Sequence, residues 1–303
     1  MSARKFLPMK TRFLAALLLA VTFSAITLSV SAAGAKKIVI VAGKPSHGPA
    51  EHEFRAGALL LKSCLDKLPG YNTTIISNGW PTDTSAFDSA DAIVLYMDGG
   101  NGHPAIQDDH LAQLGAALKH GAGLACLHYA VEVPATNGGP EFLQWLGGYF
   151  EINWSVNPMW QADFKTLPDH PITRGVKPFT IRDEWYYHMR FADKNVTPIL
   201  TAVPPDSTRE KPDDPHGGNP YVRARKGMPE VTAWAFERAD GGRGFGITGS
   251  HYHKNWGNDD FRKLVLNAIV WIAKGDVPPG GVESSVTPEQ LSQNLDPKPP
   301  KQN

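Results

Sequence analysis

The chain has 303 residues, of which 30 are basic and 30 acidic, so its formal net charge at neutral pH is zero. This length allows one large domain with a proper hydrophobic core, and the lack of a basic excess argues against a nucleic-acid-binding surface. Only two cysteines, Cys64 and Cys126, are present, which excludes a disulfide framework, and we expect no disulfide between them.

Residues 1–35 have the pattern of a secretory signal peptide. Four basic residues and no acidic one precede an apolar run from Phe13 to Val30, and small residues follow it. We expect cleavage after Ala32 or Ala35, and therefore a periplasmic or secreted protein. The alternative is an uncleaved leader that anchors the chain in a membrane, because the apolar run is nearly long enough to span a bilayer.

The next part of the chain alternates between predicted strands and helices. Short apolar runs predict strands that are covered on both faces, and apolar residues at three- and four-residue spacing predict helices. The expected order is strand 37–42, helix 54–65, strand 73–76, strand 91–97, helix 107–119 and strand 123–127. Such alternation implies an α/β three-layer sandwich around a mostly parallel central sheet.

The remainder of the chain is less regular until its last two predicted elements. Residues 153–245 contain short strand-like pieces, 244–249 predict another core strand, and 261–273 predict a closing amphipathic helix. We therefore expect one domain over 36–277. A C-terminal tail over 278–303, rich in Pro, Gly, Ser and Gln, is expected to lie over the surface or to be mobile.

The stretch 123–132, GLACLHYAVE, reads as a buried strand that ends in a sharp turn. At such an elbow the residues two before and two after the apex must be small. Cys126 and Ala130 satisfy this rule around His128, whereas Leu124 and His128 would violate it around Cys126. We therefore place His128 at the exposed apex and Cys126 in the strand, where a catalytic thiolate lacks the electropositive, accessible surroundings that it needs.

Three further histidines follow predicted strands: His47, His103 and His251. Ligands of parallel sheets bind at this edge, and neutral imidazole is both a common zinc ligand and the usual general base near neutral pH. We predict that His47, His128 and His251 share a site and hold a divalent metal such as zinc. The alternative is that each histidine braces its own loop, since the chain has no closely spaced pair such as His-Glu-x-x-His.

Acidic and aromatic residues are mixed in the segment 182–188, RDEWYYH. Carboxylates can bind sugar hydroxyls while aromatic rings stack on sugar faces, so this pattern predicts a carbohydrate pocket. The alternative is a strand whose rings pack on the domain. Glu132, four residues past the apex, either points into the same cleft or caps the next helix. The residues that we assign to substrate binding are Asp183, Trp185, Tyr187, Glu132, His103 and Trp154.

Two other motifs read as structural. Glu51, His52 and Glu53 fit the first turn of a helix, where acidic residues suit the positive end of the helix dipole. The glycine-rich segments 99–102 and 241–244 lack a P-loop lysine pattern and a GxGxxG frame, so we interpret them as turns and expect no nucleotide cofactor.

Several segments together resemble the ThuA-like (trehalose utilisation) family, a branch of the class I glutamine amidotransferase-like superfamily. They are GKPSH (43–47), CLHYA (126–130), LGGYF (146–150), DHPITRG (169–175), DEWYY (183–187), GSH (249–251) with NW (255–256), and FRKLVLNAIVW (261–271). The resemblance covers about residues 37–275 and implies the flavodoxin-like sandwich of that superfamily. Glutamine amidotransferases have cysteine at the elbow apex, where this chain has histidine, so glutamine hydrolysis through a thioester is not implied.

The resemblance implies a role in disaccharide or glycoside metabolism, on sugars oxidised at one ring hydroxyl to a ketone. A ketone acidifies the neighbouring C–H bond, so a base and an electrophile would isomerise the sugar or eliminate its glycosidic oxygen. In this interpretation His128, Glu184 and His251 are catalytic, the segment 204–228 shapes substrate choice, and the protein is expected to form a homo-oligomer. The alternatives are a non-catalytic sugar-binding protein on the same scaffold and an amidohydrolase that uses Cys126.

Overall fold

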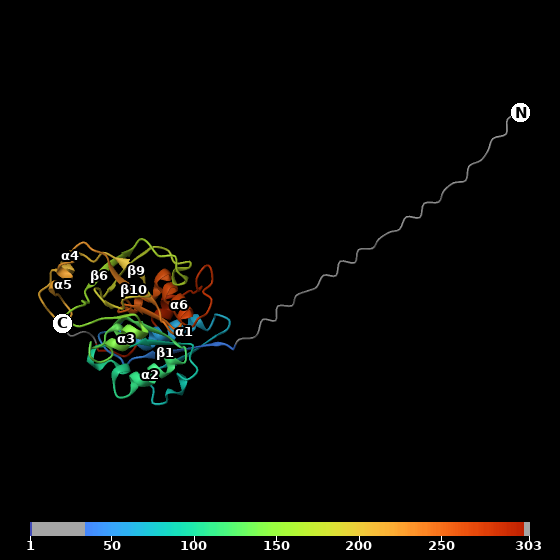
Figure 1. The fold of residues 1–303 in the computed structure, drawn as a ribbon, viewed down its shortest axis with the longest axis horizontal. Coiled ribbons are helices and arrows are strands. Elements are labelled where there is room, and N and C mark those ends of the chain that lie inside the picture. The colour runs from blue at the N-terminus through green and yellow to red at the C-terminus, as the bar shows by residue number, and fades with distance from the viewer. Residues whose placement is uncertain (2–33, 300–303) are drawn as a thin grey trace. The chain divides into compact units, whose positions relative to one another are not determined.

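Seven strands form the central sheet of the described chain, in the order β2-β1-β3-β4-β11-β10-β9. Figure 1 shows the fold as a ribbon. The first five run parallel, and β10 pairs antiparallel with both β11 and β9. Their bounds are Lys36–Ala42 (β1), Tyr71–Ile76 (β2), Ala92–Tyr96 (β3), Gly123–Leu127 (β4), Val196–Ala202 (β9), Glu230–Glu237 (β10) and Arg243–Ile247 (β11). This computed structural model describes Met1 and residues 34–299, so the predicted signal peptide lies almost wholly outside the described residues.

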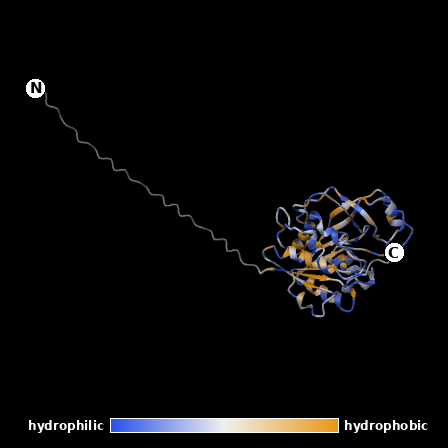
Figure 2. Ribbon diagram, turned by 180° about the vertical axis from the view of Figure 1, so that it is seen from behind, coloured by the Kyte–Doolittle hydropathy of each residue, from blue (hydrophilic) through white to orange (hydrophobic). Residues whose placement is uncertain are grey.

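Helices cover both faces of the sheet and make three layers. The long helices are α1 (Phe54–Leu65) and α6 (Asp259–Ile272) on one face, and α2 (His110–Lys119) with the shorter α3 (Gly139–Trp145) on the other. Along β1, Ile38 and Ile40 pack into the core shared with α1 and α6, while Val39 and Val41 pack into the core shared with α2. Because both faces are buried, the strand is continuously apolar, and Figure 2 shows hydrophobic residues concentrated in the strands.

The less regular part of the chain adds small elements around this sandwich. Two two-stranded sheets pair β5 with β8 and β6 with β7. These strands are Gly148–Tyr149 (β5), Met159–Phe164 (β6), Phe179–Glu184 (β7) and Arg190–Phe191 (β8). The short helices are α4 (Asp206–Arg209), α5 (Pro220–Arg223) and α7 (Pro288–Leu291), with 3-10 turns at Thr84–Ala86, Gly100–Gly102, Pro104–Ile106, His128–Val131, Pro171–Thr173 and His253–Gly257.

The predicted α/β sandwich is confirmed, and the buried strand 123–127 has the bounds that the sequence indicates. The helix expected from residue 107 begins only at His110. A 3-10 turn over Pro104–Ile106 and a left-handed Asp108, with φ of 47°, precede it. Both cysteines are free and buried, as expected.

The segment that follows α6 is more firmly packed than its composition suggests. Val277 and Val282 are buried in the core, and the Asn267 side chain accepts a hydrogen bond from the backbone of Val282. The expectation of a loose surface tail is therefore wrong for this stretch, because its apolar side chains find places in the core. Within residues 34–299, no helix combines the length and the apolar character that crossing a membrane requires.

Candidate active site

His128 stands at the turn that ends β4, where the sequence analysis places it. Its backbone is left-handed, with φ of 56°, which is the strained geometry of an elbow apex. Cys126 is fully buried in the strand below, and burial raises the pKa of its thiol far above the usual range. The His128 side chain is also fully buried, so the expectation of an exposed apex is wrong. The ring lies against other side chains that meet at this edge of the sheet.

His52 is the residue nearest to His128 among these side chains, and the sequence analysis missed it. Its Nε2 lies 3.1 Å from Nε2 of His128 and 3.0 Å from Nδ1 of His251. The prediction that residues 51–53 form the first turn of a helix is wrong, because α1 begins at Phe54 and His52 is left-handed, with φ of 44°. The sequence feature that could have identified His52 as a site residue is its place in the polar loop after β1, the loop that also contains His47.

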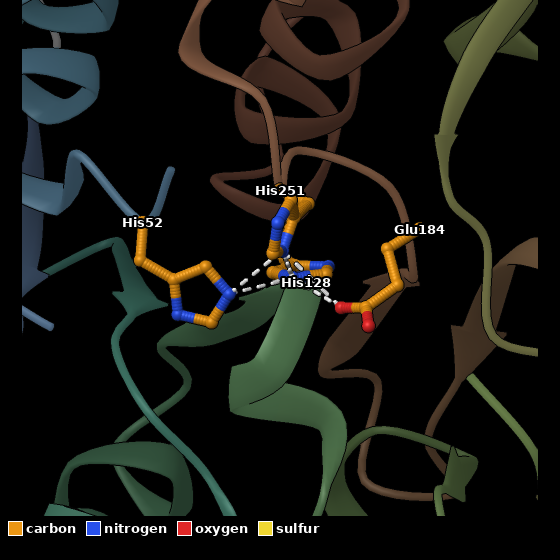
Figure 3. Close-up of side chains that lie close together, drawn as sticks. All are labelled: His52, His128, Glu184 and His251. Carbon is orange, nitrogen blue, oxygen red and sulfur yellow. Dashed lines mark hydrogen bonds and ion pairs between the residues drawn. The ribbon is translucent and has the colours of Figure 1, made fainter. Parts of the chain in front are cut away.

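Glu184 and His251 complete the cluster, as Figure 3 shows. His251 follows β11, and Glu184 is the last residue of β7. Oε2 of Glu184 lies 3.4 Å from Nε2 of His128 and 3.2 Å from Nδ1 of His251. Nδ1 of His251 and Nε2 of His128 are separated by 3.3 Å, and all four ligand atoms lie within 4.8 Å of one another. We call the four residues His52, His128, Glu184 and His251 the histidine centre.

The nitrogen atoms that point away from the centre fix two of the rings. Nδ1 of His128 lies 2.7 Å from the carbonyl oxygen of Thr248, which can only accept a hydrogen bond. Nδ1 of His52 lies 2.9 Å from Oδ1 of Asp98. If both outward nitrogens carry the hydrogen, the Nε2 atoms of these two rings face each other with lone pairs. The hydroxyl of Tyr186, 3.3 Å from Nε2 of His128, can donate to one of these lone pairs, and a proton or a metal ion between the rings would satisfy both.

The electrostatics of the ion-free centre favour one shared proton. Burial, reinforced by the neighbouring imidazoles, strongly lowers the pKa of His52, so this ring is neutral. Burial is the largest single influence on His128 and opposes its charge, but the hydrogen bond and negative charge of Glu184, the charge of Asp183 and the carbonyl of Thr248 together outweigh it and raise the pKa of His128 above its usual value. Burial likewise opposes charge on Glu184, but hydrogen bonds from His128 and His251 hold its pKa well below the usual range.

His47, which the sequence analysis counts among the metal ligands, lies outside the histidine centre. Its ring is exposed and stacks on His52 with 3.6 Å between ring centroids. Its Nδ1 lies 3.9 Å from Oδ1 of Asp98, so His47, His52 and Asp98 form a second, more exposed group of potential ligands. The structure therefore brings His128 and His251 together as predicted, and puts His52 in the place expected for His47.

Asp183 holds the backbone of the His251 turn and does not face a ligand. Its carboxylate is fully buried and accepts hydrogen bonds from the backbone of Ser250, at 2.7 Å, and of His251, at 3.1 Å. The side chain of Asn255 and the backbone of Glu184 also donate to it, both at 2.9 Å, and so does the backbone of Tyr252, at 3.4 Å. The predicted sugar-binding role is therefore replaced by a supporting one: Asp183 fixes the strained turn, where Ser250 has φ of 95°.

Three other residues assigned to substrate binding are fully buried and engaged elsewhere. Trp185 packs on Phe261 and against the backbone of Gly249, so its ring is not free to stack on a sugar. Tyr187 shares a hydrogen bond with the hydroxyl of Thr208. His103 bonds the backbone at both ring nitrogens, accepting from Ala105 and donating to Ala130. The alternative interpretation, of aromatic residues that pack on the domain, fits this segment.

Trp154 is half-buried, but other side chains already cover its ring. The guanidinium of Arg190 lies 3.5 Å from the ring centroid, and the ring of His188 stacks on it at 4.5 Å. Tyr221 contacts it as well, also at 4.5 Å between centroids. The predicted stacking of Trp154 on a sugar therefore does not fit these contacts.

Glu132 does lie beside the histidine centre, in a pair with a residue that the sequence analysis missed. Its side chain is nearly fully buried, and Oε1 lies 3.0 Å from Nε2 of His216, a half-exposed residue of the segment 204–228. Asn157 links this pair to the centre, because its backbone donates to the carbonyl of His216 at 3.0 Å and its side chain donates to Glu184 at 3.3 Å. A buried carboxylate that orients a partly exposed imidazole is an arrangement suited to proton transfer.

A cavity of about 420 Å³ lies at the carboxyl ends of β2, β1 and β3, and although none of the four residues of the histidine centre lines it, a residue bonded to His52 does. Asp98, which holds His52, is part of its wall. The wall also includes the partly exposed ring of Trp80 and the polar side chains of Lys44 and Gln107. A larger cavity, of about 690 Å³, is lined around Trp145 and Arg238 and shares no residue with the centre.

Comparisons with known proteins agree on one family. The family model ThuA, described as trehalose utilisation, matches residues 39–272. Among solved structures, a ThuA-like protein of Bacteroides uniformis ATCC 8492 has a TM-score of 0.55 at 16% identity, over 80% of this chain and 95% of its own. A ThuA-like protein of Parabacteroides merdae ATCC 43184 has a TM-score of 0.54 at 15% identity, over 84% of this chain and 94% of its own. At these identities the two structures establish a shared fold. No curated protein matches the sequence.

Proposed function

The chain belongs to the ThuA (trehalose utilisation) family, and from this premise and the histidine centre we propose that it is a carbohydrate-active enzyme with a bound divalent metal. Its proposed substrate is a disaccharide or glycoside in which one ring hydroxyl is oxidised to a ketone, and its proposed reaction is isomerisation or cleavage of the glycosidic bond. We further propose that it acts in the periplasm or outside the cell, as the pattern of residues 1–35 indicates.

The observation that carries the metal proposal is the spacing of the four ligand atoms. The ligand atoms of a tetrahedral zinc site lie about 3.4 Å apart, given zinc–ligand bonds of about 2.0–2.2 Å. The five distances described above, between the nitrogens of three imidazoles and Oε2 of Glu184, run from 3.0 to 3.4 Å. The donor set of three neutral imidazoles and one carboxylate also suits zinc and similar ions.

The outward contacts support the same assignment. Ligating imidazoles generally donate their second N–H to a carboxylate or a carbonyl group, which fixes the tautomer and the orientation of the ring. Asp98 has this role for His52, and the carbonyl of Thr248 has it for His128. A bound divalent ion would supply a Lewis acid that polarises a substrate carbonyl if it accepted the carbonyl oxygen as a further ligand beside the four residues.

In this proposal the pair of Glu132 and His216 removes the substrate proton. Glu132 holds Nε2 of His216 in its protonated form, which leaves Nδ1 of the same ring as the acceptor for a proton from the carbon next to the ketone. The half-exposed ring can meet a substrate, whereas the rings of the centre are buried. Loss of that proton produces the enolate from which either isomerisation or departure of the glycosidic oxygen follows.

The cavity beside Asp98 is the proposed place for part of the sugar. Its volume, about 420 Å³, lies within the range of small-molecule sites, roughly 300–1,000 Å³. The ring of Trp80 already stacks on His110 at 4.9 Å, so the proposed contacts are the free part of that ring and the hydrogen-bonding groups of Gln107 and Asp98. A sugar held there would extend from the histidine centre along the carboxyl edge of the sheet.

Metal analysis combined with a turnover assay tests this function. The full chain is purified in the presence of zinc and dialysed, its metal content is measured, and trehalose oxidised to the keto-sugar is offered as substrate. We expect a stoichiometric ion and turnover, both lost in His128→Ala. A protein without a bound ion, in which His128→Ala leaves turnover and sugar binding unchanged, overturns the proposal. Saturable sugar binding without turnover favours the non-catalytic alternative.

A further inference from the structure

Lys298 reaches back across the molecule to the loop that carries His52. Its ammonium group lies 3.2 Å from Oε1 of Glu53, and both side chains are almost completely buried, at 4% and 1% exposure. The same ammonium donates to the backbone carbonyls of Glu51 and His52. A buried ammonium group is stable only where acceptors surround it, and here all of the acceptors that we describe belong to residues 51–53.

Residues close to Lys298 in the sequence also contact the loop that carries His52 and the start of α1. The backbone of Asp296 donates to Oε2 of Glu53 at 2.8 Å. The guanidinium of Arg55 donates to the carbonyl of Asn294 at 3.2 Å. Glu53 therefore receives one hydrogen bond from the backbone and one ion pair from the side chain of the segment 294–298, which we call the clamp segment.

The loop needs such support because its backbone is strained. His47, Ala50 and His52 are non-glycine residues, yet all three are left-handed, with φ between 44° and 63°. Residues in this conformation persist only when the surrounding structure fixes them. On the side of the histidine centre, the backbone of His52 donates to the carbonyl of His251 at 3.0 Å. The carbonyl oxygens of Glu51 and His52 accept hydrogen bonds from Lys298 of the clamp segment.

We propose that Lys298 is a positioning residue of the histidine centre: it holds the carbonyls of Glu51 and His52 so that the imidazole of His52 stays beside His128. The part of this proposal that concerns a metal rests on the proposed function, whereas the effect on the loop does not. It predicts that removal of the Lys298 ammonium loosens residues 47–53 and withdraws one ligand from the centre, while the sandwich remains folded.

The test compares Lys298→Met with Lys298→Arg and Lys263→Met in the full chain. Arginine keeps a buried cation with hydrogen-bond donors. Lys263 of α6 binds the carbonyl of Gly280 and the carboxylate of Glu283. Its replacement therefore weakens a contact of the C-terminal part of the chain that does not involve residues 47–53. A second loop variant, Glu53→Gln, removes the other partner of the ion pair if Lys298→Met folds poorly. Circular dichroism confirms the fold of each variant.

Hydrogen exchange gives the readout that is independent of any metal. We expect the backbone amides over residues 47–57 to exchange about tenfold or more faster in Lys298→Met, because opening of the loop is a local event. Lys298→Arg should restore part of the protection, and Lys263→Met should leave it unchanged. Unchanged exchange in both Lys298→Met and Glu53→Gln would falsify the proposal.

Ion binding gives the second readout. Zinc affinity, measured by competition with a chelator, should fall about tenfold or more in Lys298→Met, which is the size of effect typical of groups that orient metal ligands. The visible spectrum of bound cobalt should change in the same variant, because one imidazole is lost. If the unmodified chain binds neither ion, the proposed metal centre fails while the exchange experiment still decides the role of Lys298. If zinc and cobalt bind equally well in all variants, Lys298 does not position His52.

Discussion

His52 and His128 direct their Nε2 atoms at each other across 3.1 Å, although the opposite nitrogen of each ring already meets an oxygen acceptor. Two neutral imidazoles in this arrangement place lone pairs against each other, and a cation between them removes that repulsion. This relationship makes the centre a better candidate for an ion site than the number of its histidines alone would.

A pair of matched substitutions tests which histidine of the loop after β1 binds the ion. His52→Ala removes a ring of the centre, so we expect the zinc content to fall from about one ion per chain to a small fraction of that. His47→Ala removes the exposed ring that stacks on His52 and should keep most of the zinc. Elemental analysis after dialysis measures both. Zinc loss in His47→Ala alone would restore the assignment that the sequence favours.

Asp183→Asn should destabilise the whole domain. The buried carboxylate accepts N–H groups from Ser250, His251, Tyr252 and Asn255 around the His251 turn and from the backbone of Glu184, and an amide cannot accept all of them. Hydrogen bonds to charged groups contribute about 1.5–3 kcal/mol each, so we expect the free energy of unfolding to fall by roughly 2–4 kcal/mol. Urea denaturation measures the change. Asp163→Asn, at an exposed carboxylate on β6, serves as the control and should cost less than about 0.5 kcal/mol.

His103 makes the stability of the fold depend on pH. Burial lowers the pKa of its imidazole to about 4, against about 6.5 in an unfolded chain. Between these two values the unfolded chain binds a proton that the folded protein excludes, so the free energy of unfolding falls as the pH falls from about 6.5 to about 4. The full effect is roughly 3 kcal/mol.

Substitution isolates this contribution of His103. The difference in unfolding free energy between pH 7 and pH 4.5 should be smaller in His103→Gln than in the unmodified chain. His120→Gln, at an exposed residue after α2, should leave the difference unchanged. Equal pH dependence in all three proteins would mean that His103 is protonated in the folded state.

His216→Ala separates proton transfer from ion binding. If the pair of Glu132 and His216 moves the substrate proton, kcat on the keto-sugar should fall about 10²–10⁴-fold while the zinc content stays constant. Lys226→Ala, in the same segment at an exposed ion pair with Glu210, is the control and should keep kcat. An unchanged kcat in His216→Ala would show that His216 only holds the segment in place.

The two thiols should be inert in the folded protein. Cys64 and Cys126 are buried, and burial raises the pKa of both thiols. We therefore expect iodoacetamide to modify neither residue until denaturant is added, with turnover unaffected, as mass spectrometry and the keto-sugar assay would show. Fast alkylation of Cys126 with loss of activity would support the amidohydrolase alternative.

The sequence was sufficient for features whose causes are local. The strand 123–127 is apolar on both faces, and the small residues around His128 identify the apex, so β4 and its turn are predictable. The same holds for α1 and α6, whose apolar periodicity is clear. The role of the half-exposed His216 could not be predicted from the sequence, because only the folding of the segment 204–228 brings it to Glu132.

The errors in the candidate site have a common physical cause. The order of residues along a strand does not indicate how each side chain points where the strand ends. In the segment 183–187 Glu184 and the hydroxyl of Tyr186 reach His128, while Trp185 and Tyr187 turn into the core. In the loop after β1, left-handed backbone at His52 directs that ring inward and leaves His47 outside. Such reversals depend on contacts with distant segments.

The three imidazoles of the centre come from positions 76 and 123 residues apart along the chain. An unfolded chain therefore has no ready-made chelating pair among them, and its affinity for the ion would be weak. An ion that binds only the native state acts as a cross-link made after folding, and it stabilises the protein in proportion to the logarithm of its free concentration. A melting temperature that climbs steadily with added zinc would then report the geometry of the centre without any substrate.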